Sequence, residues 1–314
     1  MTKENKNITG IITSIVFISS MVFISELLGS KEIIFPEISA ICLGAFVAPN
    51  LAWNTSKPRM LICISICAVL GYLISVFLPV HLYIKLLVAF ILGTTVLILS
   101  ETGFVPMLSA IILPVVLKTD NIVYPISAVI LTLSVVILLL IFEKTGIRNK
   151  REFICQKFDF KNDYMVLIKR FLVYAVLALL SVMCDCLLIC APPLVVAFTE
   201  LSNTESKARN IPVKIYVLMV VSAFTGELIR FLLCTQLKLP LFVGTVLAIT
   251  VVLIVLNIAK VYMPPILAIT TLAFLAKPQF PFYTLQISIG FGLLLLCAIK
   301  FFSEKKCNNL RKYF

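Results

Sequence analysis

The sequence predicts an all-α protein, a polytopic transmembrane helical bundle built from two repeated units of about six segments each. The first observation behind this prediction is the composition. Of the 314 residues, 61% are hydrophobic and only 13% are charged, and the mean hydropathy is +1.10. Soluble domains carry about a quarter charged residues. The chain therefore lacks the polar side chains that a water-facing surface needs, which excludes a soluble enzyme and a disordered chain.

The second observation is a series of twelve apolar segments, each bounded by a charge or a proline. A transmembrane helix needs about 20 apolar residues. Strands of a membrane barrel alternate polar and apolar residues, whereas these segments are apolar on all sides, so a barrel is excluded. In chain order the segments are Ile8–Leu28, Ile33–Trp53, Met60–Leu78, Leu82–Ser100, Phe104–Leu117, Ile122–Phe142, Val166–Cys186, Ala191–Leu201, Ile211–Leu232, Leu239–Ala259, Met263–Leu275 and Phe282–Phe302.

Three of these segments, at 104–117, 191–201 and 263–275, are shorter than a membrane span requires. Short apolar segments are typical of broken, tilted or re-entrant helices. We therefore expect eight to twelve crossings, and whether the three short segments span or re-enter stays open. The first segment is longer than a signal-peptide core and is interpreted as a retained helix.

A basic linker at 144–165 divides the chain into a first membrane repeat at 1–143 and a second at 166–314. The linker is too short for a folded domain. Its positive charge could bind anionic lipid headgroups, although the orientation of the chain in the membrane explains the charge equally well.

Matching features occur in the same order in both halves, which predicts an internal duplication. The first helix of each half ends near an acid, Glu26 or Asp185, and a proline follows, Pro36 or Pro192. Two further pairs of motifs come after these: Gly71-Tyr72-Leu73-Ile74 with Gly226-Glu227-Leu228-Ile229, and Val105-Pro106-Met107-Leu108-Ser109 with Met263-Pro264-Pro265-Ile266-Leu267.

The third observation is the distribution of the 27 basic residues. If every segment crosses and the N-terminus is cytoplasmic, most of them fall in cytoplasmic loops, as the positive-inside rule requires. This predicts a multi-pass protein of the inner (plasma) membrane with both termini inside. An even number of crossings per half makes the repeats parallel, and an odd number makes them inverted. The formal net charge of +12 therefore indicates orientation and says little about a cargo.

Ionisable groups inside a membrane are costly and are functional candidates for that reason. We expect Glu26, Asp185 and Glu227 to act as proton or ion coupling groups, with Arg230 beside Glu227 on the same helix face. The alternative is that the acids at helix ends are solvated and that Glu227 and Arg230 form a structural ion pair. Three further acids fall at segment ends and are not assigned to the path: Glu37, expected near the outer face, and Glu101 and Glu200, expected near the inner ends.

Prolines that begin short segments form the second group of candidates. A helix that starts inside the membrane points its free N–H groups and the positive end of its dipole at a ligand. Small or hydroxyl residues follow these prolines, which is also common for packing alone. The candidate path residues of this group are Pro36, Pro106, Ser109, Pro192, Pro264, Pro265, Thr270 and Thr271.

Other chemistry is poorly represented. His81 is the single histidine, and no nucleotide-binding or nucleophile motif occurs. The spacing of Cys184, Cys186 and Cys190 does not bring three sulfurs to one helix face, and most of the ten cysteines lie in apolar segments. We therefore expect no catalytic residue, no metal, no cofactor and no nucleic-acid partner.

The order of proline, basic loop and second proline motif resembles the HPP family of membrane proteins. The residues that carry the resemblance are Phe35-Pro36-Glu37, Ser56-Lys57-Pro58-Arg59 and Val105-Pro106. The histidine that gives the family its name is replaced here, and only the double proline remains at Pro192-Pro193 and Pro264-Pro265. The resemblance implies transport of nitrite or another small anion. A fainter resemblance is to the membrane domains of aromatic-acid exporters of the fusaric-acid-resistance type.

We expect a secondary transporter or channel that moves a small solute or ion through the interface of the two repeats. Without an ATP-binding motif, active transport needs an ion gradient or a separate ATPase. The rival interpretations are a non-catalytic scaffold or sensor subunit, an aromatic-acid-type exporter and an intramembrane enzyme. The expected partners are the lipid bilayer and a small solute or ion, either a small anion or a proton-coupled species, and a homo-oligomer stays open.

Overall fold

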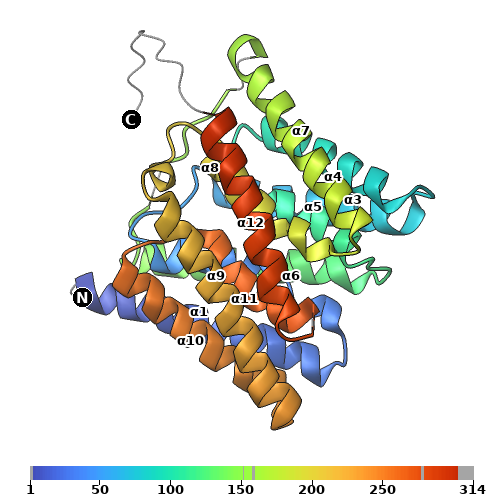
Figure 1. Ribbon diagram of the computed structural model, residues 1–314. Coiled ribbons are helices and arrows are strands. Elements are labelled where there is room, and N and C mark those ends of the chain that lie inside the picture. Colours follow the sequence, from blue (N-terminus) through green and yellow to red (C-terminus); the bar gives the residue numbers. More distant parts are fainter. Residues whose placement is uncertain (1–2, 151, 158–159, 277–278, 303–314) are drawn as a thin grey trace.

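A computed structural model describes residues 3–150, 152–157, 160–276 and 279–302, and within these ranges the chain is helical and contains no strand (Figure 1). Eight helices are long and apolar enough to cross a membrane. This confirms an all-α, polytopic membrane protein. The long helices are α1 (Lys3–Leu27), α3 (Lys57–Phe77), α4 (Leu82–Leu99), α6 (Val123–Lys144), α7 (Phe160–Met183), α9 (Pro212–Ile229, continued by the π-helical η5, Arg230–Gln236), α10 (Leu241–Ala259) and α12 (Phe282–Phe301).

Each half also has two short helices between its long ones, which are α2 (Glu37–Cys42, continued by the π-helical η2, Leu43–Val47), α5 (Pro106–Val116), α8 (Pro192–Leu201) and α11 (Pro264–Ala276). Short 3₁₀ turns lie at η1 (Lys31–Ile33), η3 (Leu187–Cys190) and η4 (Lys207–Asn210). The three segments predicted to be short are confirmed. The segment Ile33–Trp53 was expected to be a full-length helix, and this was wrong, because the helix ends at Val47. Pro49 lacks a backbone donor and disfavours helical geometry at Ala48, so the helix cannot continue.

One end of the bundle, which we call the basic end, holds the starts of α1 and α3 and the end of α6. The Lys6 ammonium near the start of α1 donates to the carbonyl of Gly146, just after α6, at 2.5 Å. Lys57 at the start of α3 pairs with Glu143 at the end of α6 at 2.7 Å. Because α1 leaves the basic end and α3 starts there, the connecting segment 28–56 must run back through the bundle, and α2 lies on it.

The second half repeats this course. Lys169 near the start of α7 donates to the carbonyl of Phe301 at the end of α12, at 3.0 Å. Lys214 near the start of α9 donates to the carbonyl of Ala259 at the end of α10, at 2.7 Å. Each short helix, with its non-helical flanks, therefore connects long helices at opposite ends of the bundle. The described chain makes twelve passes through the bundle, six in each half. The Asn7 amide near the start of α1 donates to Asn257 near the end of α10 at 3.3 Å, so both halves start at the basic end.

The two halves share hydrogen bonds at matching positions. The Tyr124 hydroxyl donates to the carbonyl of Ala110 at 2.7 Å, and the Tyr283 hydroxyl donates to that of Ile269 at 2.5 Å. Both pairs are separated by 14 residues. These contacts align α5 with α11 so that Pro106 matches Pro265. The alignment differs by one residue from the one that the sequence motifs predicted.

Helix ends correct a second alignment. Gly29 after α1 and Asp185 after α7 both have the left-handed backbone, with φ values of 63° and 51°. Their N–H groups donate to the carbonyls of Glu26 and Val182 respectively. Asp185 therefore matches Gly29, and the predicted equivalence of Glu26 and Asp185 is wrong. Gly29 and Asp185 each occupy the position just past a helix end, where left-handed backbone geometry closes the last turn.

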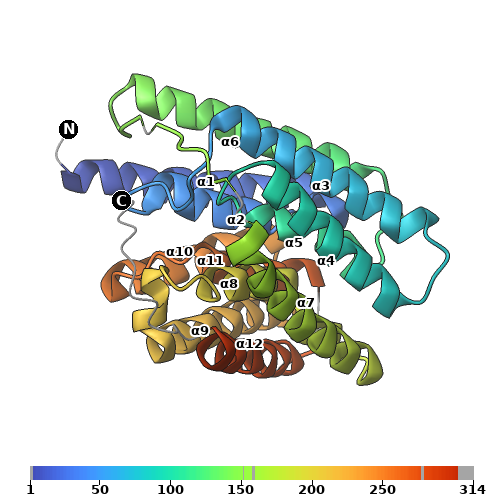
Figure 2. The ribbon, with the colours of Figure 1, turned by 90° about the horizontal axis from the view of Figure 1, so that it is seen from above.

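The short helices lie at the centre of the molecule. In Figure 2 the long helices α3 and α6 lie on one side and α9 and α12 on the other, with α5, α8 and α11 between them. Helix α2 packs against α11, and α5 packs against α8, so the central contacts join the two halves. The first long helix of each half also packs against a helix of the other half: α1 packs on α10, and α7 packs on α4. All residues of α2 and α5 are buried.

Candidate functional site

A carboxyl group lies buried where the short helices meet. Glu37 is the first residue of α2 and is 1% exposed. The Ser109 hydroxyl on α5 donates to its Oε1 atom in a short hydrogen bond. Its Oε2 atom is buried and has no hydrogen-bond partner among the described residues. A buried carboxyl oxygen without a donor carries a free energy cost that a bound proton, cation or water would relieve.

Hydroxyl groups next to this carboxyl connect the two halves. Ser39 on α2 and Thr271 on α11 share a hydrogen bond of 2.6 Å between their side-chain oxygens. The neighbouring Thr270 hydroxyl donates to the carbonyl of Ser222 on α9 at 3.3 Å. Fully buried Ser and Thr side chains of this kind are polar groups that can exchange partners with a passing solute. They lie at the contact between halves where a path is expected.

The prolines explain why this geometry forms. Pro36 precedes α2 and Pro106 begins α5, so each helix starts where a proline presets φ and needs no donor. The two helices enter from opposite ends of the bundle, and their first turns meet at Glu37 and Ser109. The carboxyl of Glu37 sits at the positive end of the α2 dipole, which favours a negative charge there.

Aromatic side chains cover this centre on the side of the basic end. The Trp53 indole N–H donates to the Glu200 carboxyl at the end of α8 at 2.9 Å, and this bond joins the two halves. The Trp53 ring also meets the Phe104 ring edge to face, with centroids 5.4 Å apart.

A second aromatic pair lies toward the opposite end. The Phe35 ring packs edge to face on Tyr124, with centroids 5.8 Å apart. Phe35 stands two residues before Glu37, so this pair covers the first turn of α2. The polar centre is thus flanked by aromatic pairs on both sides.

Two of the acids predicted for the path serve as helix caps. The Glu26 carboxylate accepts the backbone N–H groups of Leu241 and Phe242, at 2.5 and 2.9 Å, at the start of α10. The Glu227 carboxylate accepts the N–H groups of Tyr283 and Thr284, both at 3.0 Å, at the start of α12. These contacts satisfy donors that a helix start leaves unpaired. They are structural roles, and a role in coupling stays a prediction.

The remaining predicted ionisable residues lie away from the centre. Asp185 is exposed at the end of α7. Arg230 begins the π-helical turn after α9 and interacts electrostatically with Glu227. The structure therefore does not bring Glu26, Asp185 and Glu227 together.

The prolines share a structural position, at the starts of buried helices. Pro36, Pro106, Pro192, Pro264 and Pro265 all start or immediately precede the four buried short helices. Of the other candidates, Ser109 bonds to Glu37, and Thr271 bonds to Ser39 on the same helix as Glu37.

Sequence reasoning missed Glu37 as the central group and placed it near the outer face. A signal was present, since an acid directly after Pro36 falls in the first turn of a proline-led helix. We did not use this signal, because a full-length helix at Ile33–Trp53 would place Glu37 near one end of a membrane span. Glu200 was expected near the inner end of its segment, and it does lie toward the basic end beside Trp53.

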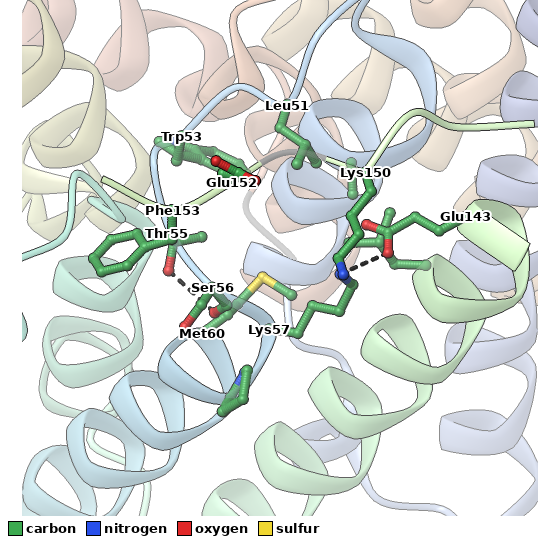
Figure 3. Close-up of a pocket in the computed structure, with 13 residues that line it drawn as sticks. Leu51, Trp53, Thr55, Ser56, Lys57, Met60, Glu143, Lys150, Glu152 and Phe153 are labelled. Carbon is green, nitrogen blue, oxygen red and sulfur yellow. Dashed lines mark hydrogen bonds and ion pairs between the residues drawn. The ribbon is translucent and has the colours of Figure 1, made fainter. Parts of the chain in front are cut away.

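A pocket of about 450 Å³ opens at the basic end beside α3 and the linker (Figure 3). Figure 3 shows the ion pair between Lys57 and Glu143 on its wall. Lys150 and Glu152 also line it, so basic and acidic groups are balanced here. In the described part of the chain, no group of three His, Cys, Asp or Glu side chains could hold a metal ion, and the nine described cysteines are free.

The fold and this centre define a multi-pass helical membrane protein. No protein-family model matches the chain, and no significant match was found among curated proteins or solved structures. The resemblance to the HPP family therefore stays a prediction, as does the fainter one to aromatic-acid exporters.

Proposed function

We propose that the protein is a secondary transporter or channel for a small solute or ion, with its path between the two halves and with Glu37 as the proton or cation site. The observation that carries the proposal is the buried Glu37 carboxyl, held by Ser109 through one oxygen and unpartnered at the other. An ionisable group deep in a membrane protein is costly and is retained where it serves a function.

The arrangement of the short helices supports a path at this place. Transporter sites form where discontinuous helices start within the membrane at the interface of two repeats. Here α2 and α5 start beside each other, and the Ser39–Thr271 hydrogen bond joins one half to the other within one turn of Glu37. The Trp53–Glu200 hydrogen bond is a second polar contact between the halves, on the side of the basic end.

An internal duplication also fits this function. The two halves have the same order of passes and similar hydrogen bonds at their left-handed helix ends, and both start at the basic end. Two similar halves that rock about a shared site are a common basis of alternating access. We further propose that the basic end is cytoplasmic, because the basic residues concentrate there. This orientation would place both termini inside, with residues 1–2 and 303–314 lying outside the described part of the chain.

The test uses purified full-length protein in proteoliposomes that contain a pH-sensitive dye. Nitrite and other small anions are added first, and small cations second, and the proton movement that each solute induces is recorded. We expect Glu37→Gln to abolish solute-induced proton movement and Glu37→Asp to retain part of it. Glu205→Gln is the matched control, since Glu205 is an exposed acid on the loop between α8 and α9.

Two outcomes would count against the proposal. Unchanged proton movement in Glu37→Gln would remove Glu37 from the path. No flux of any solute by the wild-type protein, together with a partner that co-purifies, would favour the scaffold or sensor subunit instead.

A further inference from the structure

A second pocket at the basic end differs from the one in Figure 3 in its charge. It has a volume of about 1060 Å³ and lies between the start of α1, the end of η2 and the linker after α6. Three basic residues line it, Lys6, Arg148 and Lys150, and no acidic residue is among its lining residues. Side-chain amides and a tyrosine complete the wall: Asn7, Asn50, Asn149 and Tyr262. We call this the basic pocket.

Arg148 is the residue whose surroundings point to a ligand. Its Nη1 atom donates to the carbonyl of Pro49 at 3.3 Å, whereas its Nη2 atom is shielded from solvent and has no hydrogen-bond partner. A guanidinium group presents its N–H donors as a planar fork that matches phosphate and carboxylate oxygens. Burial lowers the pKa of the Arg148 guanidinium, so its charge is poorly solvated where it stands. Arg148 lies on the pocket wall with two lysines and no acid, so an anion in the pocket would supply the counter-charge that the lining lacks.

The first pocket shows that a lysine at this end need not attract an anion. Lys57 is neutralised there by Glu143 at 2.7 Å, and Glu152 lies on the same wall as Lys150. The basic pocket lies at the same end of the bundle and shares Leu51 and Lys150 with the first pocket. Neither Glu143 nor Glu152 lines it. Positive-inside orientation explains the number of basic residues at this end, but it does not explain why three of them line one pocket that no acid lines.

We propose that the basic pocket binds the phosphate group of an anionic molecule, with Arg148, Lys150 and Lys6 as the contacting residues. Its volume is far larger than a free phosphate ion needs, so the phosphate would belong to a larger molecule. That molecule is either a phospholipid headgroup or a soluble phosphorylated compound. This inference does not depend on the proposed transport path.

The experiment measures ligand affinity by thermal unfolding of the full-length, delipidated protein in detergent. The probes are short-chain phosphatidylglycerol, short-chain phosphatidylcholine and glycerol 3-phosphate. The variants are Arg148→Gln and Lys150→Gln, with Lys57→Gln as the matched control because Lys57 lines only the balanced pocket. Lys150 is exposed, so its variant folds even if the loss of the Pro49 contact weakens Arg148→Gln.

We expect phosphatidylglycerol to bind more tightly than phosphatidylcholine, and each test variant to weaken binding by about tenfold, as for a charge-assisted hydrogen bond to phosphate. Lys57→Gln should change the affinity by less than about twofold. Binding of phosphatidylglycerol alone identifies a lipid headgroup as the ligand, and binding of glycerol 3-phosphate identifies a soluble phosphorylated compound. Wild-type affinity in both test variants, or no binding of any anionic probe, would overturn the proposal.

Discussion

The two halves of the molecule have the same order of helices but place different side chains at its centre. The N–H of Ile38 donates to the carbonyl of Phe35, and the N–H of Leu194 donates to that of Ala191, which aligns Glu37 with Pro193. By the hydrogen bonds of the two tyrosines, Ser109 aligns with Ala268. The carboxyl and its hydroxyl donor therefore come from the first half alone. A matching backbone in both halves supports a polar group that only one half supplies.

The largest effects should come from packing that both halves share. A Cβ atom on Gly71 would lie 2.4 Å from the carbonyl oxygen of Ile111, and one on Gly226 would lie 2.7 Å from that of Thr270. We expect Gly71→Ala and Gly226→Ala each to lower the free energy of unfolding by about 1–3 kcal/mol, because the long helix must move away from the short one. Unfolding in a denaturing detergent measures this.

Gly292→Ala on α12 is the matched control for these glycines. A Cβ atom there would meet the Tyr216 ring at 3.5 Å, an ordinary contact, and the helix gains from alanine. If Gly71→Ala were harmless while Gly226→Ala unfolded the protein, the halves would not share this close packing.

An effect of similar size should follow from the two carboxylates that cap helices of the second half. Glu227 accepts two backbone N–H groups and also the Thr284 hydroxyl at 2.5 Å, and it is fully buried. We expect Glu227→Gln to cost about 1–3 kcal/mol, because a buried amide cannot accept all three donors. Glu26→Gln should cost less, since Glu26 accepts two N–H groups and is only half-buried. Chemical unfolding of both variants tests the order, and a larger loss in Glu26→Gln would contradict it.

The smallest changes in stability are expected for variants at matching positions of α5 and α11. Ser109→Ala removes the donor to the Glu37 carboxyl and should cost about 0.5–1.5 kcal/mol. Ala268→Ser places a hydroxyl at the matching position of α11, where it can bond to its own helix, and should change stability by less than about 0.5 kcal/mol.

The same pair of variants has a second measurement. In proteoliposomes Ser109→Ala should alter solute-induced proton movement and Ala268→Ser should not. Equal responses of the two variants would show that the polar centre is shared between the halves after all.

Hydropathy was sufficient to predict the twelve helical segments and the three short ones, because each apolar segment is bounded by residues that end helices. It could not predict the length of α2. The segment Ile33–Trp53 is apolar apart from Glu37, Ser39 and Asn50. The break in its helix depends on Pro49 and on the turn that brings Trp53 to Glu200. Hydropathy does not distinguish a helix from an extended segment that is buried in a protein.

The candidate site was predicted in part for a similar reason. The prolines were chosen as candidates because they begin short segments, and in the structure each of them lies at the start of a buried short helix. The acids were ranked by their place in the sequence motifs, and Glu26 and Glu227 cap helices that follow far later in the chain. Only tertiary contacts show that those carboxylates are satisfied and that Glu37 is not.

The packing of α1 on α10 has a consequence for biosynthesis. Glu26 and its hydrogen-bond partner Leu241 are 215 residues apart. At about 5–20 residues per second, the ribosome needs roughly 10–40 seconds to make the chain between them. During that time α1 is inserted without its main neighbour, and its polar end has no helix start to cap. Until α10 arrives, α1 can pack on η1, α2 and η2 of its own half, and a chain truncated before α10 would leave the side of α1 that faces α10 uncovered.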